Sequence, residues 1–312
     1  MLKKGEMMQK LEGRDYNVFD DLLQKAKAKG AIKVAVVQPV DETSFSGMMD
    51  SYQAGLIEPI LVGDSSKIQA LAKQFNFDIS KFELVDATDD VDAAKKGTEF
   101  ATKGIAKALM KGNIHTNDIM SAVLKRDAGL RTDRNISHIF VMDIPAYHKA
   151  LMITDAAINV APDLKAKMSI LKNSVEFAHK MGIKQPKVAI LSAVEMPYDK
   201  VPSSIEADEL SKMAKDEVKD ALVYGPLAFD NAISEVSAKI KKIHSPVCGD
   251  PDILLVPQIE SGNILFKSLV YLGYAKVAGV VIGAKVPIIL TSRADNAEAR
   301  VASSALAVIA SE

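Results

Sequence analysis

Val286-Pro287-Ile288-Ile289-Leu290-Thr291-Ser292-Arg293-Ala294-Asp295 is the stretch that indicates the fold, because its apolar run predicts a buried strand leading into the last helix. In open α/β sheets, ligands bind at such strand ends. Ser292 and Arg293 there supply a hydroxyl, a backbone N–H near a helix N-terminus and a planar guanidinium. We therefore predict a site for a tetrahedral oxyanion such as phosphate, since helix capping explains Thr291 and Asp295 but gives Arg293 no role.

Strand and helix patterns alternate along nearly the whole chain, which predicts an α/β fold with mainly parallel sheets. Runs rich in Val, Ile and Leu predict strands at Ile32–Val37, Pro59–Val62, Phe82–Val85, Ile139–Asp143, Ala156–Val160, Lys187–Ser192, Ala221–Tyr224, Asp252–Pro257, Val277–Ile282 and Pro287–Leu290. Helical periodicity predicts helices that include Asp20–Lys29, Ser66–Phe75, Asp92–Met110, Leu164–Met181, Ser203–Lys215, Asn231–Lys242, Gly262–Leu272 and Asn296–Ile309. Gly30, Gly112 and Gly182 are expected at helix C-caps, and Asp163 and Ser203 at helix starts.

The length of 312 residues favours two domains. Residues 1–133 and 284–312 are expected to form one discontinuous three-layer αβα domain, and residues 134–283 a second. The chain would cross between them near 124–136 and again near Gly283. This arrangement would place Ser292 and Arg293 at an interdomain cleft, where small-molecule sites are common.

The composition excludes several classes of function. The formal net charge of −1 provides no field that recruits nucleic acid or an anionic membrane. No apolar run reaches the roughly 18 residues of a membrane span, and the charged start of the chain does not resemble a signal sequence, so we expect a cytoplasmic protein. The single cysteine, Cys248, excludes an intrachain disulfide, and its apolar neighbours predict an inert thiol.

The motifs of nucleotide hydrolysis, nicotinamide chemistry and metalloproteases are absent from the sequence. The five histidines show no metal-ligand spacing, so we expect no metal site. His115 beside Thr116 is a candidate ligand contact. Asp230, after an expected strand, either caps the next helix or contacts substrate. Asn263 and Lys267 lie four residues apart on one helical face and form a second polar candidate.

These segments, taken in order, resemble the phosphate acetyltransferase/phosphate butyryltransferase family. The resemblance runs from about Phe19 to the C-terminus and rests on Gly225-Pro226-Leu227 with Asp230, Gly249–Pro257, Gly262-Asn263-x-x-x-Lys267, Gly283-Ala284-Lys285 and Thr291–Asp295. Features similar to the butyryl branch are Gly129–Thr132, Ser137-His138 and Asp155–Pro162.

The resemblance implies reversible transfer of an acyl group, with butyryl favoured, between coenzyme A and inorganic phosphate. It also implies a fold like that of isocitrate and isopropylmalate dehydrogenases, a homodimer, and a coenzyme A thioester as substrate without a tightly bound cofactor. Arg293 would bind phosphate or the developing oxyanion, and Ser292 the thioester carbonyl or the departing thiolate. A phosphate nucleophile is already anionic near neutral pH, so it needs positioning and charge screening more than deprotonation. Because Cys248 is expected to be inert, direct attack in a ternary complex is favoured over an acyl-enzyme. The expected substrate-binding residues include Thr291, Asp230, Gly262, Asn263, Lys267, His115 and Thr116.

The sequence departs from the acetyl-type pattern at three places. The aspartate expected seven residues after the serine is Ala299, so Asp295 or Glu298 would act as base, or no protein base is required. The loop 116–122 lacks the usual arginine, which leaves Arg126 or Arg131 to supply that charge. Phe266 stands where a tyrosine is usual.

Two alternatives to this enzyme remain open at the level of sequence. The chain could be a non-catalytic module that senses acyl-CoA, which the retained Ser292 and Arg293 disfavour. It could also transfer the acyl group to phosphate from an acyl-carrier protein, whose acidic surface would require a basic docking face.

Overall fold

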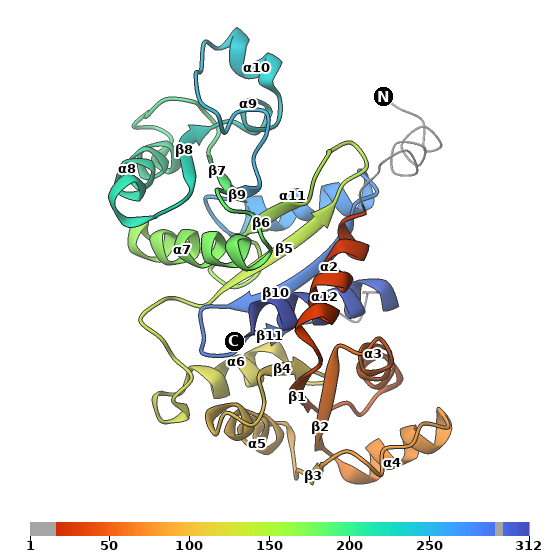
Figure 1. Ribbon diagram of the computed structural model, residues 1–312. Coiled ribbons are helices and arrows are strands. Elements are labelled where there is room, and N and C mark those ends of the chain that lie inside the picture. Colours follow the sequence, from red (N-terminus) through yellow and green to blue (C-terminus); the bar gives the residue numbers. More distant parts are fainter. Residues whose placement is uncertain (1–16, 291–295, 312) are drawn as a thin grey trace. The chain divides into compact units, whose positions relative to one another are not determined.

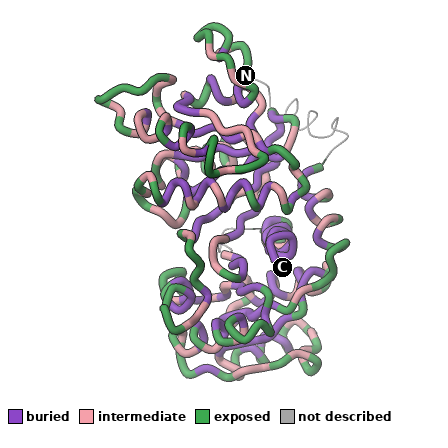
Figure 2. The backbone as a smooth tube through the Cα atoms, turned by 60° about the vertical axis from the view of Figure 1, so that its left-hand side comes forward, coloured by how far each residue is buried: buried purple, intermediate pink, exposed green. Residues whose placement is uncertain are grey.

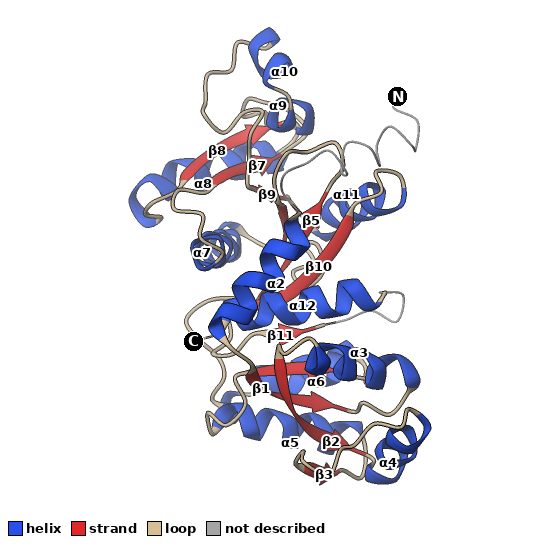
Figure 3. Ribbon diagram, turned by 45° about the vertical axis from the view of Figure 1, so that its right-hand side comes forward, coloured by secondary structure: helices blue, strands red, loops and turns tan. Residues whose placement is uncertain are grey.

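The computed structural model of the protein describes residues 17–290 and 296–311, which form two compact units (Figure 1). Unit 1 contains 17–19 and Arg134–Val277. Unit 2 contains Asp20–Asp133 together with 278–290 and 296–311. Figure 3 shows the alternation of helices and strands that the sequence predicts.

Unit 2 is built on strands in the order β3-β2-β1-β4-β11-β10. Their bounds are β1 (Ile32–Val37), β2 (Ile57–Gly63), β3 (Leu84–Asp86), β4 (Ala108–Lys111), β10 (Lys276–Ile282, whose first two residues belong to unit 1) and β11 (Ile288–Ile289). All neighbouring pairs in this order are parallel except β10 with β11. The carboxyl ends of β1, β2, β3, β4 and β11 therefore lie at one edge of the sheet, which we call the unit 2 carboxyl edge.

The helices of unit 2 are α2 (Val18–Lys29, whose first two residues belong to unit 1), α3 (Glu42–Gln53), α4 (Ser65–Gln74), α5 (Asp90–Thr102), α6 (Thr116–Leu124) and α12 (Ala297–Ala310), with a short 3₁₀ helix η1 (Arg126–Ala128). The carboxylates of Asp41, Asp64 and Asp89 cap α3, α4 and α5. Helix α12 is buried along most of its length (Figure 2), as its Ala-, Val- and Leu-rich sequence requires. Its buried Ser304 hydroxyl forms a hydrogen bond of 2.8 Å with Ser51 of α3.

Unit 1 has strands in the order β5-β6-β9-β7-β8, and the pairs are parallel except β5 with β6. The strands are β5 (Ser137–Asp143), β6 (Leu151–Thr154), β7 (Lys187–Leu191), β8 (Leu222–Leu227) and β9 (Ile253–Leu255). The helices are α7 (Leu164–Lys180), α8 (Pro202–Glu217), α9 (Phe229–Ile233), α10 (Glu235–Ile240) and α11 (Ile259–Tyr271). The carboxyl ends of β6, β7, β8 and β9 form the unit 1 carboxyl edge.

The structure corrects the predicted helix Asp92–Met110. Helix α5 ends at Thr102, Gly104 follows with φ +71°, and Ala108–Lys111 is strand β4. The run Ala-Leu-Met-Lys has no β-branched residue, so its local preference is helical, but its buried place between β1 and β11 makes it a strand. Gly112 is consequently not a helix C-cap.

Two further expectations are wrong for local reasons. Ala156–Val160 is not a strand, because the Asp155 carboxylate accepts hydrogen bonds from the backbone N–H groups of the next residues and closes a turn; the strand is Leu151–Thr154 instead. The single helix predicted over Asn231–Lys242 is interrupted at Ser234, which is extended and caps α10. Asp163 caps α7 as predicted, whereas Ser203 follows Pro202 inside the first turn of α8.

A partly exposed cluster of ion pairs links the amino ends of β7 and β9 in unit 1. The Asp250 carboxylate pairs with Lys149 and Lys187, and Asp252 pairs with Lys149 at 2.7 Å. Burial by itself would raise the pKa of Asp250, but hydrogen bonds from Lys187 and Lys149 lower it to about 2. The carboxylate therefore stays ionised and fastens these strand ends together.

Candidate functional site

The unit 2 carboxyl edge holds the end of β11 and the loop that carries His115 and Thr116. Strand β11 runs parallel to β4 with Ile289 opposite Met110, so the chain leaves β11 at Leu290 beside the end of β4. The segment that follows Leu290 carries Thr291, Ser292, Arg293 and Asp295, which lie outside the described residues. The loop that follows β4 leads through His115 to Thr116, the first residue of α6.

Helix α6 begins at this edge with groups suited to an anion. His115 is its N-cap residue, makes no side-chain capping hydrogen bond, and is exposed together with Thr116. The first N–H groups of a helix have no partner within the helix, and the helix dipole favours negative charge there. His115 and Thr116 therefore lie at a helix N-terminus, a position where an anionic group can be bound.

Gln38 organises the loops of this edge, a role that the sequence did not reveal. Its backbone has φ +57°, its side chain is buried, and its carbonyl accepts a hydrogen bond of 2.7 Å from the Asn113 N–H. Its Nε2 donates to Asp90 at 2.8 Å, and its Oε1 accepts from the Asp64 N–H at 3.2 Å. The Gln38 side chain thus links the end of β2 to the start of α5, and its backbone carbonyl links the end of β1 to the loop after β4. The signal available in the sequence is a polar residue directly after a buried strand.

Gly112 is required by this arrangement. A Cβ atom on residue 112 would lie 2.2 Å from the Gln38 carbonyl oxygen, a backbone atom that cannot move away independently. The close approach brings the start of the 112–116 loop against the end of β1. This glycine, predicted as a helix cap, instead shapes the candidate site.

Helix α12 begins later than the sequence suggested. Asn296 is the N-cap and accepts a hydrogen bond of 2.8 Å from the Ala299 N–H, so the first helical residue is Ala297 and not the predicted Asn296. Glu298 is exposed in the first turn, whereas Ala299 is 9% exposed. A carboxylate at residue 299 would be largely buried, and Glu298 points from a different face of the helix. Glu298 therefore does not reproduce the position that an aspartate at 299 would have.

Arg126 and Arg131 do not join His115 and Thr116. Arg126 lies in η1, beyond the C-terminal end of α6, and the helix from Thr116 to Leu124 is itself about 12 Å long at 1.5 Å per residue. Arg131 forms a backbone bridge with Ala284, and the adjacent Thr132 hydroxyl donates to the Gly283 carbonyl at 2.6 Å. Both arginines are exposed, and both are displaced from the unit 2 carboxyl edge.

A second group of predicted residues meets at the unit 1 carboxyl edge. The Asp155 side chain is buried, and its two oxygens accept hydrogen bonds of 2.9, 3.0 and 3.2 Å from the N–H groups of Ala157, Ile158 and Asn159. A further bond of 2.6 Å comes from the Asn159 amide, which also donates to the Ile136 carbonyl. The 155–159 segment is therefore a fixed turn, which we call the Asp155 turn.

Helix α11 starts directly against the Asp155 turn. A Cβ atom on Gly262 would lie 2.7 Å from the side chains of Ala156 and Val256, so glycine allows the helix to touch the turn. Asn263 Nδ2 lies 3.5 Å from the Ala156 carbonyl oxygen. Lys267 is exposed one turn further along the same face. The structure thus brings Gly262, Asn263 and Lys267 together at a strand end, as predicted.

His138 lies beneath this turn and is neutral at physiological pH. Its ring packs on Phe140 with centroids 4.2 Å apart, and Phe140 stacks on Phe266 at 4.1 Å. Burial lowers the pKa of His138 to about 4, and the nearby Asp155 opposes this shift only partly. His138 therefore supports the Asp155 turn as an uncharged ring and does not supply a cation.

Asp230 is exposed, and its carboxylate accepts a hydrogen bond of 2.8 Å from the Ser237 hydroxyl. It does not cap α9, whose N-cap is Ala228. Its neighbour Asn231 is 1% exposed, and neither polar atom of its side chain has a hydrogen-bond partner among the described residues. Asn231 is thus an unusual buried amide at the unit 1 carboxyl edge, a position for which the sequence predicts only the start of a helix.

Cys248 is buried, and burial raises the pKa of its thiol. A thiol that stays protonated near neutral pH is a poor nucleophile. Within the described ranges, no group of three or more His, Cys, Asp or Glu side chains is arranged to hold a metal ion. No helix there is long and apolar enough to span a membrane.

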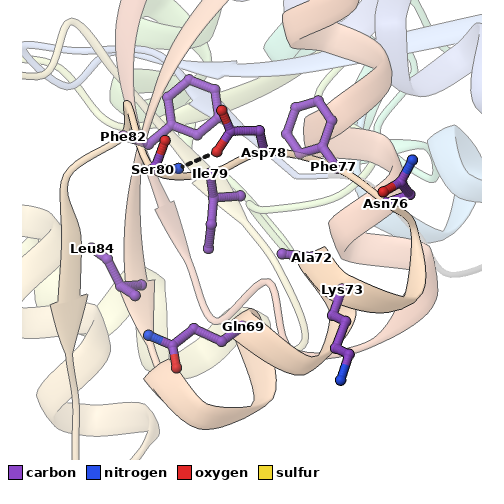
Figure 4. Close-up of a pocket in the computed structure, with 10 residues that line it drawn as sticks. All are labelled: Gln69, Ala72, Lys73, Asn76, Phe77, Asp78, Ile79, Ser80, Phe82 and Leu84. Carbon is purple, nitrogen blue, oxygen red and sulfur yellow. Dashed lines mark hydrogen bonds between the residues drawn. The ribbon is translucent and has the colours of Figure 1, made fainter.

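Unit 2 also has a hollow between α4 and the loop before β3 (Figure 4). It measures about 580 Å³ and is lined by Phe77, Ile79, Phe82 and neighbouring side chains. Its one carboxylate, Asp78, already accepts a hydrogen bond of 2.9 Å from the Ser80 N–H. Because Leu84 marks the amino end of β3, this hollow is at the edge opposite the predicted site segments.

Comparison with known proteins assigns the chain to a family of acyltransferases. A model of the phosphate acetyl/butaryl transferase family matches residues 88–308, so the chain belongs to this family. A phosphate acetyltransferase of Rhizobium meliloti is 46% identical over 292 residues, which cover 93% of this chain and 92% of the relative. A phosphate butyryltransferase of Clostridium acetobutylicum is 39% identical over 93% of this chain and 97% of the relative.

The fold agrees with this assignment. The crystal structure of a branched-chain phosphotransacylase from Enterococcus faecalis V583 is similar with a TM-score of 0.78 and 32% identity, over 90% of this chain and all of that one. The resemblance inferred from the sequence motifs is therefore confirmed at the level of the family and of the mixed α/β fold.

Proposed function

We propose that this protein catalyses reversible transfer of a short-chain acyl group between coenzyme A and inorganic phosphate. The observation that carries the proposal is the register of β11 with β4. Leu290, the last described residue before Thr291-Ser292-Arg293, therefore follows β11 at the same sheet edge as the loop that carries His115 and leads to the N-terminus of α6. A guanidinium and a helix N-terminus at one sheet edge suit an anionic nucleophile.

In the proposed reaction, a phosphate oxygen attacks the carbonyl carbon of the thioester. The tetrahedral intermediate collapses with breakage of the C–S bond, and the electron pair leaves on the coenzyme A thiolate. Arg293 binds phosphate and stabilises the oxyanion, while Ser292 donates a hydrogen bond to the carbonyl oxygen or the leaving sulfur. The raised pKa of Cys248 supports direct attack in a ternary complex over an acyl-cysteine intermediate.

We assign substrate contacts to the polar residues of both sheet edges. In unit 2 these are His115, Thr116 and Thr291, and in unit 1 they are Asp230, Gly262, Asn263 and Lys267. The Asp155 turn supports the start of α11, and its sequence is of the butyryl type. We therefore propose butyryl as the preferred acyl group, and a coenzyme A thioester as substrate rather than a resident cofactor. Both substrates are cytoplasmic metabolites, which favours a cytoplasmic enzyme.

We further propose that the enzyme is a homodimer that associates through unit 1. Along α11 only Gly262 is buried, whereas Ile264, Tyr271 and Leu272 are 66%, 72% and 76% exposed. A large apolar surface of this kind is typical of a subunit interface. In analytical ultracentrifugation, Leu272→Lys should sediment as a monomer, while Ile240→Lys on α10 should remain a dimer. A monomeric wild-type protein would contradict the proposal.

The proposed reaction is tested by phosphate-dependent release of free thiol from acetyl-, butyryl- and isobutyryl-CoA. Arg293→Ala should lower kcat/KM by at least about 100-fold, the effect of removing a transition-state charge partner. Arg134→Ala is the matched control, because the half-buried Arg134 pairs with Glu176 and lies outside the proposed site. A butyryl preference would support the chain-length proposal, and an acetyl preference would refute it.

Other outcomes discriminate between the alternatives. Binding of acyl-CoA by folded protein without thiol release from any thioester would favour an acyl-CoA sensor. Phosphate-dependent acyl phosphate formation from an acyl-carrier protein, but not from coenzyme A thioesters, would identify the carrier protein as donor.

A further inference from the structure

A pocket of about 220 Å³ in unit 2 lies between α5 and α6 and is closed at one end by η1. Helix α5 packs its other flank on the sheet, where the absence of a side chain at Gly97 admits Val37 of β1. Residues of α5 and α6 spaced three or four apart face the pocket, which is the spacing of one helical face. The pocket is therefore formed by the facing sides of two regular helices and not by irregular loops.

Five charged side chains line this pocket without neutralising one another. They are Lys95, Glu99, Asp118, Lys125 and Asp127. None of them forms an ion pair within 4.0 Å or a side-chain hydrogen bond with another described residue. Lys96, by contrast, pairs with Asp92 at 2.6 Å on the adjacent flank of α5. The charges of the pocket are thus available to a ligand.

A buried hydroxyl in the pocket wall also has no partner. Thr98 is 4% exposed, and its Oγ1 makes no hydrogen bond with any described residue. Thr102, one turn further on, donates to the Ala128 carbonyl at 2.6 Å and fastens η1 to α5. A helical threonine usually bonds the carbonyl four residues earlier, so an unpartnered Thr98 hydroxyl next to a gap is unusual.

We propose that this pocket binds a small zwitterion of the L-α-amino acid class. The ammonium group of the ligand pairs with Glu99, Asp118 and Asp127, and its carboxylate pairs with Lys95 and Lys125. The pocket has three carboxylates and two lysine ammonium groups, so a ligand that carries only negative charge is disfavoured. In this respect the pocket differs from the proposed phosphate site. Its volume is somewhat larger than the engineered cavity of about 150 Å³ that admits benzene, which suits a single amino acid.

The test uses the purified full chain and isothermal titration calorimetry with each proteinogenic L-amino acid. Inorganic phosphate, acetate and methylammonium serve as probes that carry one kind of charge. At least one amino acid should bind and should raise the melting temperature, while acetate and methylammonium should bind at least about tenfold more weakly, because each can make only one set of charged contacts.

Variants decide whether binding occurs in this pocket. Glu99→Gln and Lys95→Met should each weaken binding by about tenfold, the effect of losing one charge-assisted contact. Both side chains are exposed on α5, so circular dichroism should show a native fold. Lys103→Met at the C-terminal end of α5 is the matched control and should bind as wild type.

Three results would overturn the proposal. The first is the absence of binding by any amino acid. The second is binding that is unchanged in both Glu99→Gln and Lys95→Met. The third is tighter binding of inorganic phosphate than of any amino acid with loss of that binding in Lys95→Met, which would make the pocket an anion site.

Discussion

Replacement of Asp155 by asparagine tests whether one buried carboxylate holds the Asp155 turn. Asparagine has nearly the same shape but only one acceptor oxygen. That oxygen can still accept from the N–H groups of Ala157 and Ile158, which both bond Oδ1 in the wild type. The new amide group would face the two donors of Asn159 that now bond Oδ2. Two hydrogen bonds to a charged acceptor are therefore lost.

The expected magnitude follows from these contacts. A hydrogen bond to a charged group contributes about 1.5–3 kcal/mol when buried. The donors are only partly buried, and water replaces part of each bond, so a loss of about 1 to 1.5 kcal/mol per bond is appropriate. We expect Asp155→Asn to destabilise unit 1 by about 2–3 kcal/mol, which corresponds to a fall of about 4–12 °C in melting temperature at about 2–4 °C per kcal/mol.

The assay is urea unfolding followed by circular dichroism, together with calorimetry at neutral pH. Asp163→Asn is the matched control, because Asp163 caps α7 through a bond of 2.8 Å from the Ala166 N–H and asparagine caps helices about equally well. The control should change stability by less than about 0.5 kcal/mol. If Asp155→Asn is as stable as this control, the carboxylate does not hold the turn and the reasoning is refuted.

Three other predictions concern the packing of Gly262 against the Asp155 turn, the ion pairs of Asp250 and the identity of a catalytic base. Gly262→Ala should destabilise unit 1 by about 1–3 kcal/mol and raise the KM for acyl-CoA, because the new Cβ atom would lie 2.7 Å from the Ala156 side chain. An unchanged free energy of unfolding and an unchanged KM would show that α11 can shift to accommodate the methyl group. The folded pKa of Asp250, about 2, lies below the ordinary 3.8, so its stabilising effect is present above about pH 4 and is lost as the pH falls toward 2. Asp250→Asn should therefore show a shallower loss of stability over this range in acid-unfolding curves, and curves parallel to wild type would contradict the assignment. Asp295→Asn or Glu298→Gln should alter the acidic limb of the pH–rate profile if either carboxylate is the base, and unchanged profiles in both variants would eliminate a base in this segment.

The sequence predicted those parts of the fold that depend on local signals. Ile32–Val37 was predicted with its observed bounds because β-branched residues dominate it. Asp163 was predicted as a helix start because an aspartate after a proline is a strong cap signal. The candidate residues Gly262, Asn263 and Lys267 were identified because a glycine followed by polar residues four apart opens a helix after a strand. The family resemblance was carried by several such short segments in a fixed order.

Other features depended on residues far apart in the chain. Ala108–Lys111 is a strand only because β1 and β11 pair with it on either side. Gln38 and Gly112 matter to the candidate site because a loop 74 residues later in the chain packs so closely on the Gln38 carbonyl that a Cβ atom on residue 112 would lie 2.2 Å from its oxygen. No periodicity in the sequence records this contact. Arg126 and Arg131 seemed suitable by charge, but a helix of nine residues separates Arg126 from Thr116.

The sequence by itself determined the class of fold, the family and the polar segments that follow the strands, because periodicity, turn chemistry and motif order are properties of neighbouring residues. Only the tertiary structure decided which strand ends are neighbours, that the Asp155 carboxylate closes a turn, and that the charges between α5 and α6 remain unpaired. The physical reason is that burial and pairing are set by contacts between distant segments. These contacts can override the local preference of a short run such as Ala108–Lys111.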